Sequence, residues 1–193
     1  TTYVITDSRK IANHIKTDKA YVIYDDVKAQ SGTERIANII RSLPEDNIIN
    51  VQGDQPFISP GAILEMVNYM KEHPQYDIVT PIKLHNKDKY DDPSKCKVVV
   101  SQSGRAIYFS RSPIPFNGTE YWGHLGMYGY TNQFLRNYRK LKVSPLETTE
   151  KLEQLRFIDN DIRIQTYKTA HSIFSVDTEV DLVNAIEHAR ELI

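Results

Sequence analysis

The sequence contains one cysteine, Cys96, among 193 residues. A single thiol excludes an internal disulfide and a zinc site built from several cysteines, and its place in the apolar stretch CKVVV predicts a small buried side chain. No apolar run approaches the roughly 18 residues of a membrane-spanning helix, and the first residues, TTYVITDSRK, lack a signal-peptide pattern. We therefore expect a reducing, cytoplasmic setting without membrane insertion.

An excess of charge of one sign is also missing. The 24 Lys and Arg residues nearly balance the 25 Asp and Glu residues, and no Lys/Arg cluster exceeds a few residues. Nucleic acid and other polyanions are therefore not expected as partners. The sequence has no internal repeat, low-complexity segment or long linker, while 40% of its residues are hydrophobic. These features predict one domain over residues 1–193, or one domain with a small subdomain.

Short β-branched runs alternate with helical patterns through the first half. Strands are predicted at 3–6, 20–25, 47–52 and 77–84, and helices after Asp7, over SGTERIANIIRSL and over 61–73. This alternation favours right-handed crossovers, and so an α/β fold with a doubly wound, mainly parallel sheet and helices on both faces. In the second half, KVVVSQ and AIYFSRS flank Ser103 and Gly104, which predicts an added antiparallel hairpin.

Polar residues follow two of the apolar runs, where ligands bind in open α/β sheets. After the third strand, Gly53 allows a sharp turn or the close approach of a ligand, and Asp54 offers a hard oxygen suited to Mg²⁺. Alternatively, Asp54 forms an Asx-turn before Pro56. Asp177 follows SIFSV in the same way, and it either caps the last helix or shares a metal site with Asp54. A shared Mg²⁺ site would suit a nucleotide-dependent transferase.

Two further patterns favour ligand binding at a helix start and at a strand end. Ser31 and Glu34 in QSGTER form a capping-box pattern, and the same helix N-terminus presents free N–H groups to an anion or a nucleobase. Arg111 follows AIYFS, where its guanidinium could hold a substrate carboxylate.

Four other polar positions are ambiguous. His124 and Tyr128 flank the strand HLGMY, and a histidine beside apolar residues is more often structural than a catalytic base. Glu153 and Gln154 border the buried face of a helix, where most such pairs are solvated.

Seven segments, taken in order, resemble the 3-deoxy-manno-octulosonate cytidylyltransferase family, also called CMP-Kdo synthetases. They are QSGTERIA, NVQGDQP, DPSKCKVVV, IYFSRSPIP, HLGMYGY, SPLETTEKLEQLR and SVDTEVDL, and together they cover essentially the whole chain. The resemblance implies a nucleotide-diphospho-sugar transferase-like fold and a reaction of CTP with Kdo (3-deoxy-manno-octulosonate) to give CMP-Kdo and pyrophosphate. It also implies a homodimer that serves bacterial lipopolysaccharide or capsule synthesis.

The resemblance assigns roles to individual residues. Asp54 and Asp177 would hold Mg²⁺ against the triphosphate and so carry catalysis. The sugar pocket would contain Gln52, Arg111, His124, Tyr128, Glu153 and Gln154, and the nucleotide would lie near Gln30, Ser31, Gly32 and Asp54. The anomeric hydroxyl of Kdo would attack the α-phosphorus in line with the departing pyrophosphate, so no covalent nucleophile is required.

The pattern departs from the family at its start. Family members begin with a strand and a basic, glycine-containing loop for the triphosphate, which this sequence does not contain. We therefore expect the cytidylyltransferase domain at 1–193 to be N-terminally incomplete. Two other functions stay open: a cytidylyltransferase for another 2-keto acid sugar, such as an amino-Kdo or a sialic acid, and a non-catalytic binding protein on the same scaffold.

Overall fold

The structure, a computed structural model, describes residues 1–176 and 178–191. The strands are β1 (Tyr3–Thr6), β2 (Tyr21–Tyr24), β3 (Asn47–Asn50), β4 (Ile78–Asn86), β5 (Lys97–Val100), β6 (Ala106–Ser110), β7 (Glu120–His124), β8 (Tyr128–Thr131) and β9 (Gln165–Lys168). The α-helices are α1 (Arg9–His14), α2 (Gly32–Ile39), α3 (Pro60–Glu72), α4 (Asn132–Asn137), α5 (Pro145–Glu150), α6 (Leu155–Asp159) and α7 (Glu179–Glu191). Short 3₁₀ helices are η1 (Ile40–Ser42), η2 (Lys87–Lys89) and η3 (Tyr138–Lys140).

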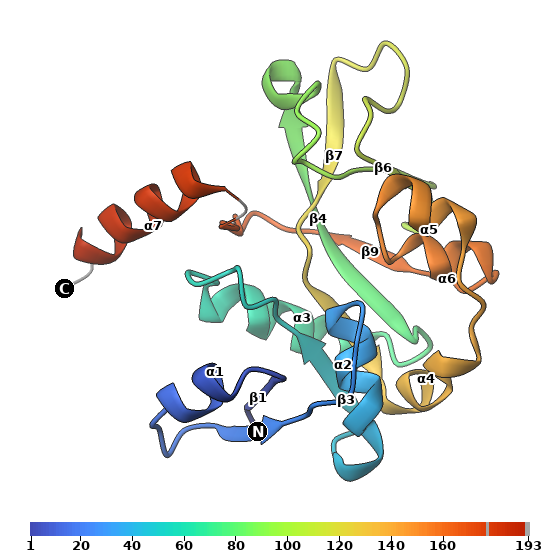
Figure 1. The fold of residues 1–193 in the computed structure, drawn as a ribbon. Coiled ribbons are helices and arrows are strands. Elements are labelled where there is room, and N and C mark those ends of the chain that lie inside the picture. Colours follow the sequence, from blue (N-terminus) through green and yellow to red (C-terminus); the bar gives the residue numbers. More distant parts are fainter. Residues whose placement is uncertain (177, 192–193) are drawn as a thin grey trace.

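The strands form a small sheet and a large one. β1 and β2 pair in parallel as a two-stranded sheet. The other seven strands form a sheet of order β3-β8-β4-β7-β5-β6, with β9 paired to β4. β9 is parallel to β4, whereas the other pairs in this sheet are antiparallel. In Figure 1 the long strand β4 runs through the middle of the molecule, and α7 projects away from it.

The α/β class is as predicted, but the doubly wound, mainly parallel sheet is not confirmed. β3 and β4 do run in the same direction, yet β8 lies between them and is antiparallel to both. A short apolar run in the sequence does not indicate whether the strand is parallel or antiparallel, or which strand it pairs with. The alternation in the first half therefore could not show that a strand from the second half is inserted.

The predicted antiparallel hairpin is present as β5 and β6. Its turn contains Gly104, whose φ of 78° lies in the left-handed region that favours glycine. A Cβ at this position would also collide with the side chain of Gln165, so both the backbone and the available space require glycine.

Two apolar clusters fix the strands that lead to the candidate site. Helix α3 packs Met66 and Met70 against Val79 of β4, and a Cβ on Gly129 of β8 would lie only 2.5 Å from the Sδ atom of Met70. The other cluster stacks Tyr130 on its neighbours Tyr128 and Phe134. Burial of such apolar surface contributes about 25 cal/mol per Å² to stability, which makes β4 and β8 a rigid base for the site. Within the described residues, no helix has both the length and the apolar character needed to cross a membrane.

Candidate active site

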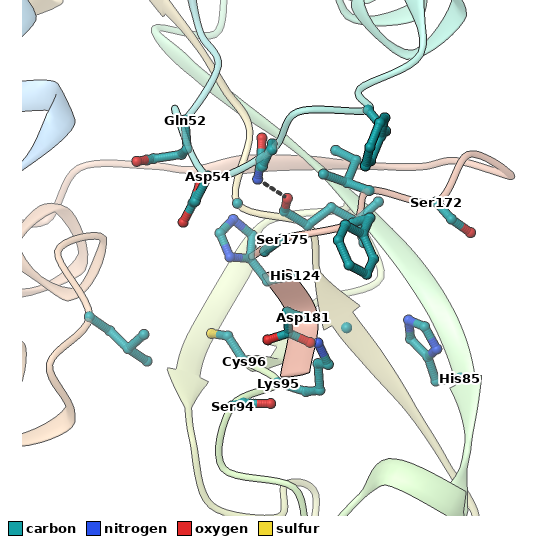
Figure 2. A pocket seen from close by; sticks show the side chains of 18 of the residues that line it. Gln52, Asp54, His85, Ser94, Lys95, Cys96, His124, Ser172, Ser175 and Asp181 are labelled. Atoms are coloured by element: carbon teal, nitrogen blue, oxygen red, sulfur yellow. Dashed lines mark hydrogen bonds between the residues drawn. The ribbon is translucent and has the colours of Figure 1, made fainter. Parts of the chain in front are cut away.

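A cleft of about 1190 Å³ opens where β3 and β7 end and where β5 and β8 begin. Its walls come from the segment after β3, the loop before β5, the end of β7, the turn before α6, and α7. Figure 2 shows His124 between Asp54 on one side and Cys96 on the other. Sites for a single ligand measure about 300–1,000 Å³. This cleft is therefore slightly larger than the upper end of that range.

The segment after β3 turns directly into the cleft. The N–H of Gln55 donates to the carbonyl of Gln52 (3.1 Å), and this turn places Gln52 and the exposed Asp54 on the cleft wall. The N–H of Val176 donates to the carbonyl of Asp54 (2.8 Å), which ties the segment before α7 to this turn. Asp177, the other predicted metal ligand, lies outside the described residues.

His124 is a neutral hydrogen-bond acceptor in this cleft. The hydroxyl of Thr80 donates its one proton to the carbonyl of Met127 (2.8 Å), because a carbonyl can only accept. Nε2 of His124 lies 2.9 Å from the same hydroxyl oxygen and must therefore donate to it. Burial lowers the pKa of His124 from 6.5 to about 3. The ring is thus uncharged with its proton on Nε2, and Nδ1 keeps a lone pair that no described residue uses.

Tyr128 and Gln154 lie on the cleft near Cys96. The hydroxyl of Tyr128 is buried and has no hydrogen-bond partner among the described residues. Nε2 of Gln154 donates to Sγ of Cys96 at 3.5 Å. Burial raises the pKa of the Cys96 thiol to about 12, so this cysteine is protonated at neutral pH. The side chain is only partly buried, in contrast to the buried side chain predicted from the sequence, because it borders the cleft.

Glu153 connects the cleft to the N-terminus of α2. It accepts hydrogen bonds from the hydroxyls of Ser31 (2.6 Å), Tyr138 (3.0 Å) and Thr33 (3.1 Å). Burial raises the pKa of Glu153, while these three hydrogen bonds oppose that shift. Glu153 therefore lines the cleft, but its oxygens are already engaged by the protein.

Of the predicted nucleotide-side residues, Asp54 lines the cleft, whereas Gln30, Ser31 and Gly32 do not. Ser31 caps α2 by accepting from the N–H of Glu34 (3.1 Å), while Glu34 accepts from the N–H of Gln30 (2.7 Å), one residue earlier than a capping box requires. A Cβ on Gly32 would lie 3.3 Å from Nδ2 of Asn50 and 3.4 Å from Oε1 of Gln52. Ser31 and Gly32 thus lie next to cleft residues, whereas the Gln30 side chain is exposed.

Arg111 also lies behind the cleft wall rather than on it. Its Nη1 donates to the carbonyl of Pro93 (3.0 Å) and its Nε to the carbonyl of Glu150 (3.2 Å). Among the described residues, Arg111 has no carboxylate within ion-pair distance, so its charge is not neutralised by the protein. The structure thus brings Gln52, Asp54, His124, Tyr128, Glu153 and Gln154 together, and places Arg111, Ser31 and Gly32 just outside.

Comparison with known proteins identifies the family. The sequence model of a family described as Cytidylyltransferase matches residues 1–164. A 3-deoxy-manno-octulosonate cytidylyltransferase of Rickettsia prowazekii (strain Madrid E) is 42% identical over 195 residues, which is 99% of this chain and 79% of the relative. The chain belongs to this cytidylyltransferase family.

Two more comparisons agree with the assignment of this chain to the cytidylyltransferase family. The enzyme of the same name from Rickettsia typhi (strain Wilmington) is 43% identical and matches 98% of this chain and 80% of the relative. The solved structure of a CMP:2-keto-3-deoxy-manno-octonic acid synthetase complexed with CTP superposes with a TM-score of 0.91 at 31% identity, over 99% of this chain and 81% of that one. The fold is therefore nucleotidyltransferase-like.

Sequence reasoning missed two polar residues that shape the cytidylyltransferase cleft. Thr80 sets the tautomer of His124. Lys97 is fully buried behind the cleft wall, although a lysine in an apolar run is ordinarily taken as solvent-facing. The signal for Lys97 is its place in CKVVV, between Cys96 and three valines, because a lysine within a strand that is buried on both faces is itself buried.

Proposed function

We propose that this cytidylyltransferase transfers the cytidylyl group of CTP to Kdo and releases pyrophosphate. The observation that carries the proposal is the grouping of the predicted metal and sugar residues Asp54, Gln52, His124, Tyr128 and Gln154 around one cleft, in a chain that superposes on a CTP-bound synthetase. The cleft would hold both the nucleotide and the sugar.

Charge in the cleft wall supports an acidic sugar. Lys95 and Lys151 line the cleft, and the charges of Arg111 and Lys97 lie beside Cys96. None of these four cations has a carboxylate within ion-pair distance among the described residues. Unpaired cations next to a cleft favour an anionic ligand, here the carboxylate of a 2-keto acid sugar.

Neutral side chains of the cleft would orient the sugar hydroxyls. Nδ1 of His124 would accept a hydrogen bond from the sugar, and the buried hydroxyl of Tyr128 would donate one to it. Burial raises the pKa of Tyr128 well above 10, so that this hydroxyl keeps its proton. Such groups hold the anomeric hydroxyl against the α-phosphorus, and positioning of this kind supplies much of the rate of a phosphoryl-type transfer.

A magnesium ion is part of the proposal. The described residues contain no group of three or more His, Cys, Asp or Glu side chains that could cage a metal. Mg²⁺ bound with a nucleotide needs only one or two carboxylates, because phosphates and waters complete its shell. The exposed Asp54 fits that requirement, and Asp177 is the proposed second ligand. The ion would neutralise charge on the triphosphate.

The remaining parts of the proposal rest on the family resemblance. The protein would act in the cytoplasm, where CTP is available, as a homodimer. Its product would supply an activated sugar acid for bacterial lipopolysaccharide or capsule.

Pyrophosphate release from CTP, Mg²⁺ and Kdo tests the proposed function. Asp54→Asn keeps the side-chain shape but removes the charge, and we expect it to lower turnover by about a hundredfold or more. Asp177→Asn should behave in the same way. Asp159→Asn, which changes an exposed carboxylate on α6, is the matched control and should keep normal turnover.

The same assay separates the alternatives. Faster turnover with an amino-Kdo or a sialic acid than with Kdo would change the assigned sugar. Binding of CTP without pyrophosphate release from any of these sugars would point to a non-catalytic protein. Normal turnover by Asp54→Asn at limiting Mg²⁺ would remove Asp54 from the metal site.

A further inference from the structure

Lys97 is a fully buried lysine whose ammonium group bonds to two backbone carbonyls. Its Nζ donates to the carbonyls of Asp92 (2.6 Å) and Arg111 (2.8 Å). Among the described residues, it forms no ion pair. A lysine buried without a carboxylate at ion-pair distance is costly, and burial does lower its pKa, although the more distant charges of Asp92 and Asp91 oppose that shift. Apolar packing alone would be better served by methionine, so the position calls for a donor.

The two carbonyls belong to two different parts of the cleft wall. Asp92 begins the loop at 92–96, in which Ser94, Lys95 and Cys96 line the cleft. Arg111 follows β6, and its own Nη1 returns to the carbonyl of Pro93 in the same loop (3.0 Å). The loop is thus tied to the end of β6 at two points. Lys97 bonds to the carbonyls of both Asp92 and Arg111, and the guanidinium of Arg111 bonds to the carbonyl of Pro93.

The backbone of Lys97 adds the third side of this wall. Lys97 pairs with Ser110 of β6 and with Gly123 of β7. The carbonyl of the preceding residue, Cys96, accepts from the N–H of His124 (2.9 Å). The side chain of Lys97 thus holds the loop and Arg111, while its backbone and that of Cys96 join β5 to the end of β7 that carries His124.

We propose that Lys97 is a positioning residue that holds the 92–96 loop, Arg111 and His124 in the arrangement that binds the sugar acid. The inference rests on the proposed function for its kinetic readout. Lys97 does not touch substrate in this proposal; it acts through the residues that do.

Replacement of Lys97 by methionine tests the proposal kinetically. Lys97→Met keeps an unbranched side chain of nearly the same length and removes the donor, so we expect the KM for Kdo to rise about tenfold or more while the KM for CTP changes little. Val98→Ala is the control, because Val98 is the next residue of β5, is buried in the core on the opposite face and bonds to neither carbonyl. It should lower thermal stability without changing the ratio of the two KM values.

The single cysteine gives a readout that does not depend on the reaction. Cys96 ends the 92–96 loop, and its alkylation by iodoacetamide, followed by mass spectrometry, reports how firmly the loop is held. The charge of Lys97 lowers the pKa of Cys96, so loss of that charge alone would slow alkylation. We expect Lys97→Met to accelerate the alkylation of Cys96 about tenfold, the factor that corresponds to one or two lost hydrogen bonds. Because loss of the charge alone would slow alkylation, a faster rate indicates that the loop opens. Val98→Ala should leave the rate near that of the unaltered protein.

The outcomes separate this inference from the proposed function. If the unaltered protein releases no pyrophosphate with Kdo, the proposed function fails, and the alkylation rates still test the loop. If the unaltered protein is active and Lys97→Met changes neither the KM for Kdo nor the alkylation rate, Lys97 is not a positioning residue. Should Lys97→Met fail to fold, Lys97→Gln, which keeps a shorter donor, must show intermediate shifts in both readouts, and unshifted values would equally overturn the proposal.

Discussion

The proton on Nε2 of His124 determines what this side chain offers to a substrate. The bond to Thr80 leaves Nδ1 as an acceptor, and burial, the sole cause of the shift, holds the pKa near 3. His124 therefore cannot act as a cationic partner for a carboxylate or phosphate at neutral pH. The aromatic rings of Phe109 and Tyr128 contact the imidazole of His124, and neither ring carries a charge that could stabilise a protonated His124.

A pH dependence of stability follows from this pKa. Because the pKa is about 3 in the folded state and about 6.5 when exposed, the unfolded chain binds more protons between these values. The contribution of His124 is full above pH 6.5 and is lost progressively as the pH falls toward 3. We expect His124→Gln to flatten the decline in melting temperature between pH 6.5 and 4.5, as recorded by calorimetry. His14→Gln, at an exposed position on α1, is the control. Parallel pH profiles for the His124 variant and the unaltered protein would contradict a buried neutral ring.

The reason for glycine at position 53 could not be decided from the sequence. Its φ does not lie in the left-handed region, and no atom lies within 4 Å of the place where a Cβ would be. The sharp turn suggested by the sequence is therefore not the reason for glycine here. Close approach of a ligand remains the prediction, since the space in front of Gly53 is open.

At the scale of elements, hydrogen bonds between α2 and the turn before α6 connect the predicted nucleotide residues Ser31 and Gly32 to the cleft residue Glu153. Three hydroxyl groups donate to Glu153, and the hydroxyl of Tyr138 in turn accepts from Nη1 of Arg156 (2.9 Å). Arg156 forms a bidentate pair with Glu147, at 2.7 Å for both contacts. A chain of bonds thus runs from α5 to the first turn of α2, where Ser31 and Gly32 lie.

We expect Glu153→Gln to loosen this connection. The amide replaces one acceptor oxygen by a donor that faces a hydroxyl donor, and a buried group left without a partner costs about 1–3 kcal/mol. Urea unfolding should show a loss in that range, and the KM for CTP should rise more than the KM for Kdo, because Ser31 and Gly32 lose their support. Glu72→Gln on the exposed side of α3 is the control. An unchanged unfolding midpoint would show that Glu153 does not support α2.

Some of the helices and strands could be predicted from the sequence, but their pairing in the sheet could not. Strand positions and the β5–β6 hairpin follow from local patterns, since β-branched runs and a glycine turn are local properties. The antiparallel insertion of β8 between β3 and β4 is a long-range pairing without a local signature. The polar residues after β3 were found by the strand-end rule, whereas Lys97 and Thr80 act from within strands, where that rule does not apply.

At the scale of the whole molecule, the distribution of residues on α7 is unusual for a surface helix. Asp181, Asn184 and His188 face the cleft, and Ala185 on the same side is its buried residue. The opposite side carries three exposed apolar residues, Leu182, Val183 and Ile186, and the exposed Val180 lies between the two sides. In an ordinary surface helix the apolar side faces the protein. The outward apolar side of α7 supports the proposal that a second copy of the chain covers it.

The last prediction tests this dimer. Val183 is 55% exposed on the outward side of α7, and Val143, before α5, is 62% exposed elsewhere on the surface. An aspartate in an apolar interface is buried without a partner, so we expect Val183→Asp to shift sedimentation velocity from dimer to monomer. The same change at Val143 matches it in chemistry and should leave the dimer intact. If Val143→Asp dissociates the dimer and Val183→Asp does not, the interface lies on the other surface; if the unaltered protein sediments as a monomer at micromolar concentration, the homodimer proposal is wrong and the apolar side of α7 needs another explanation.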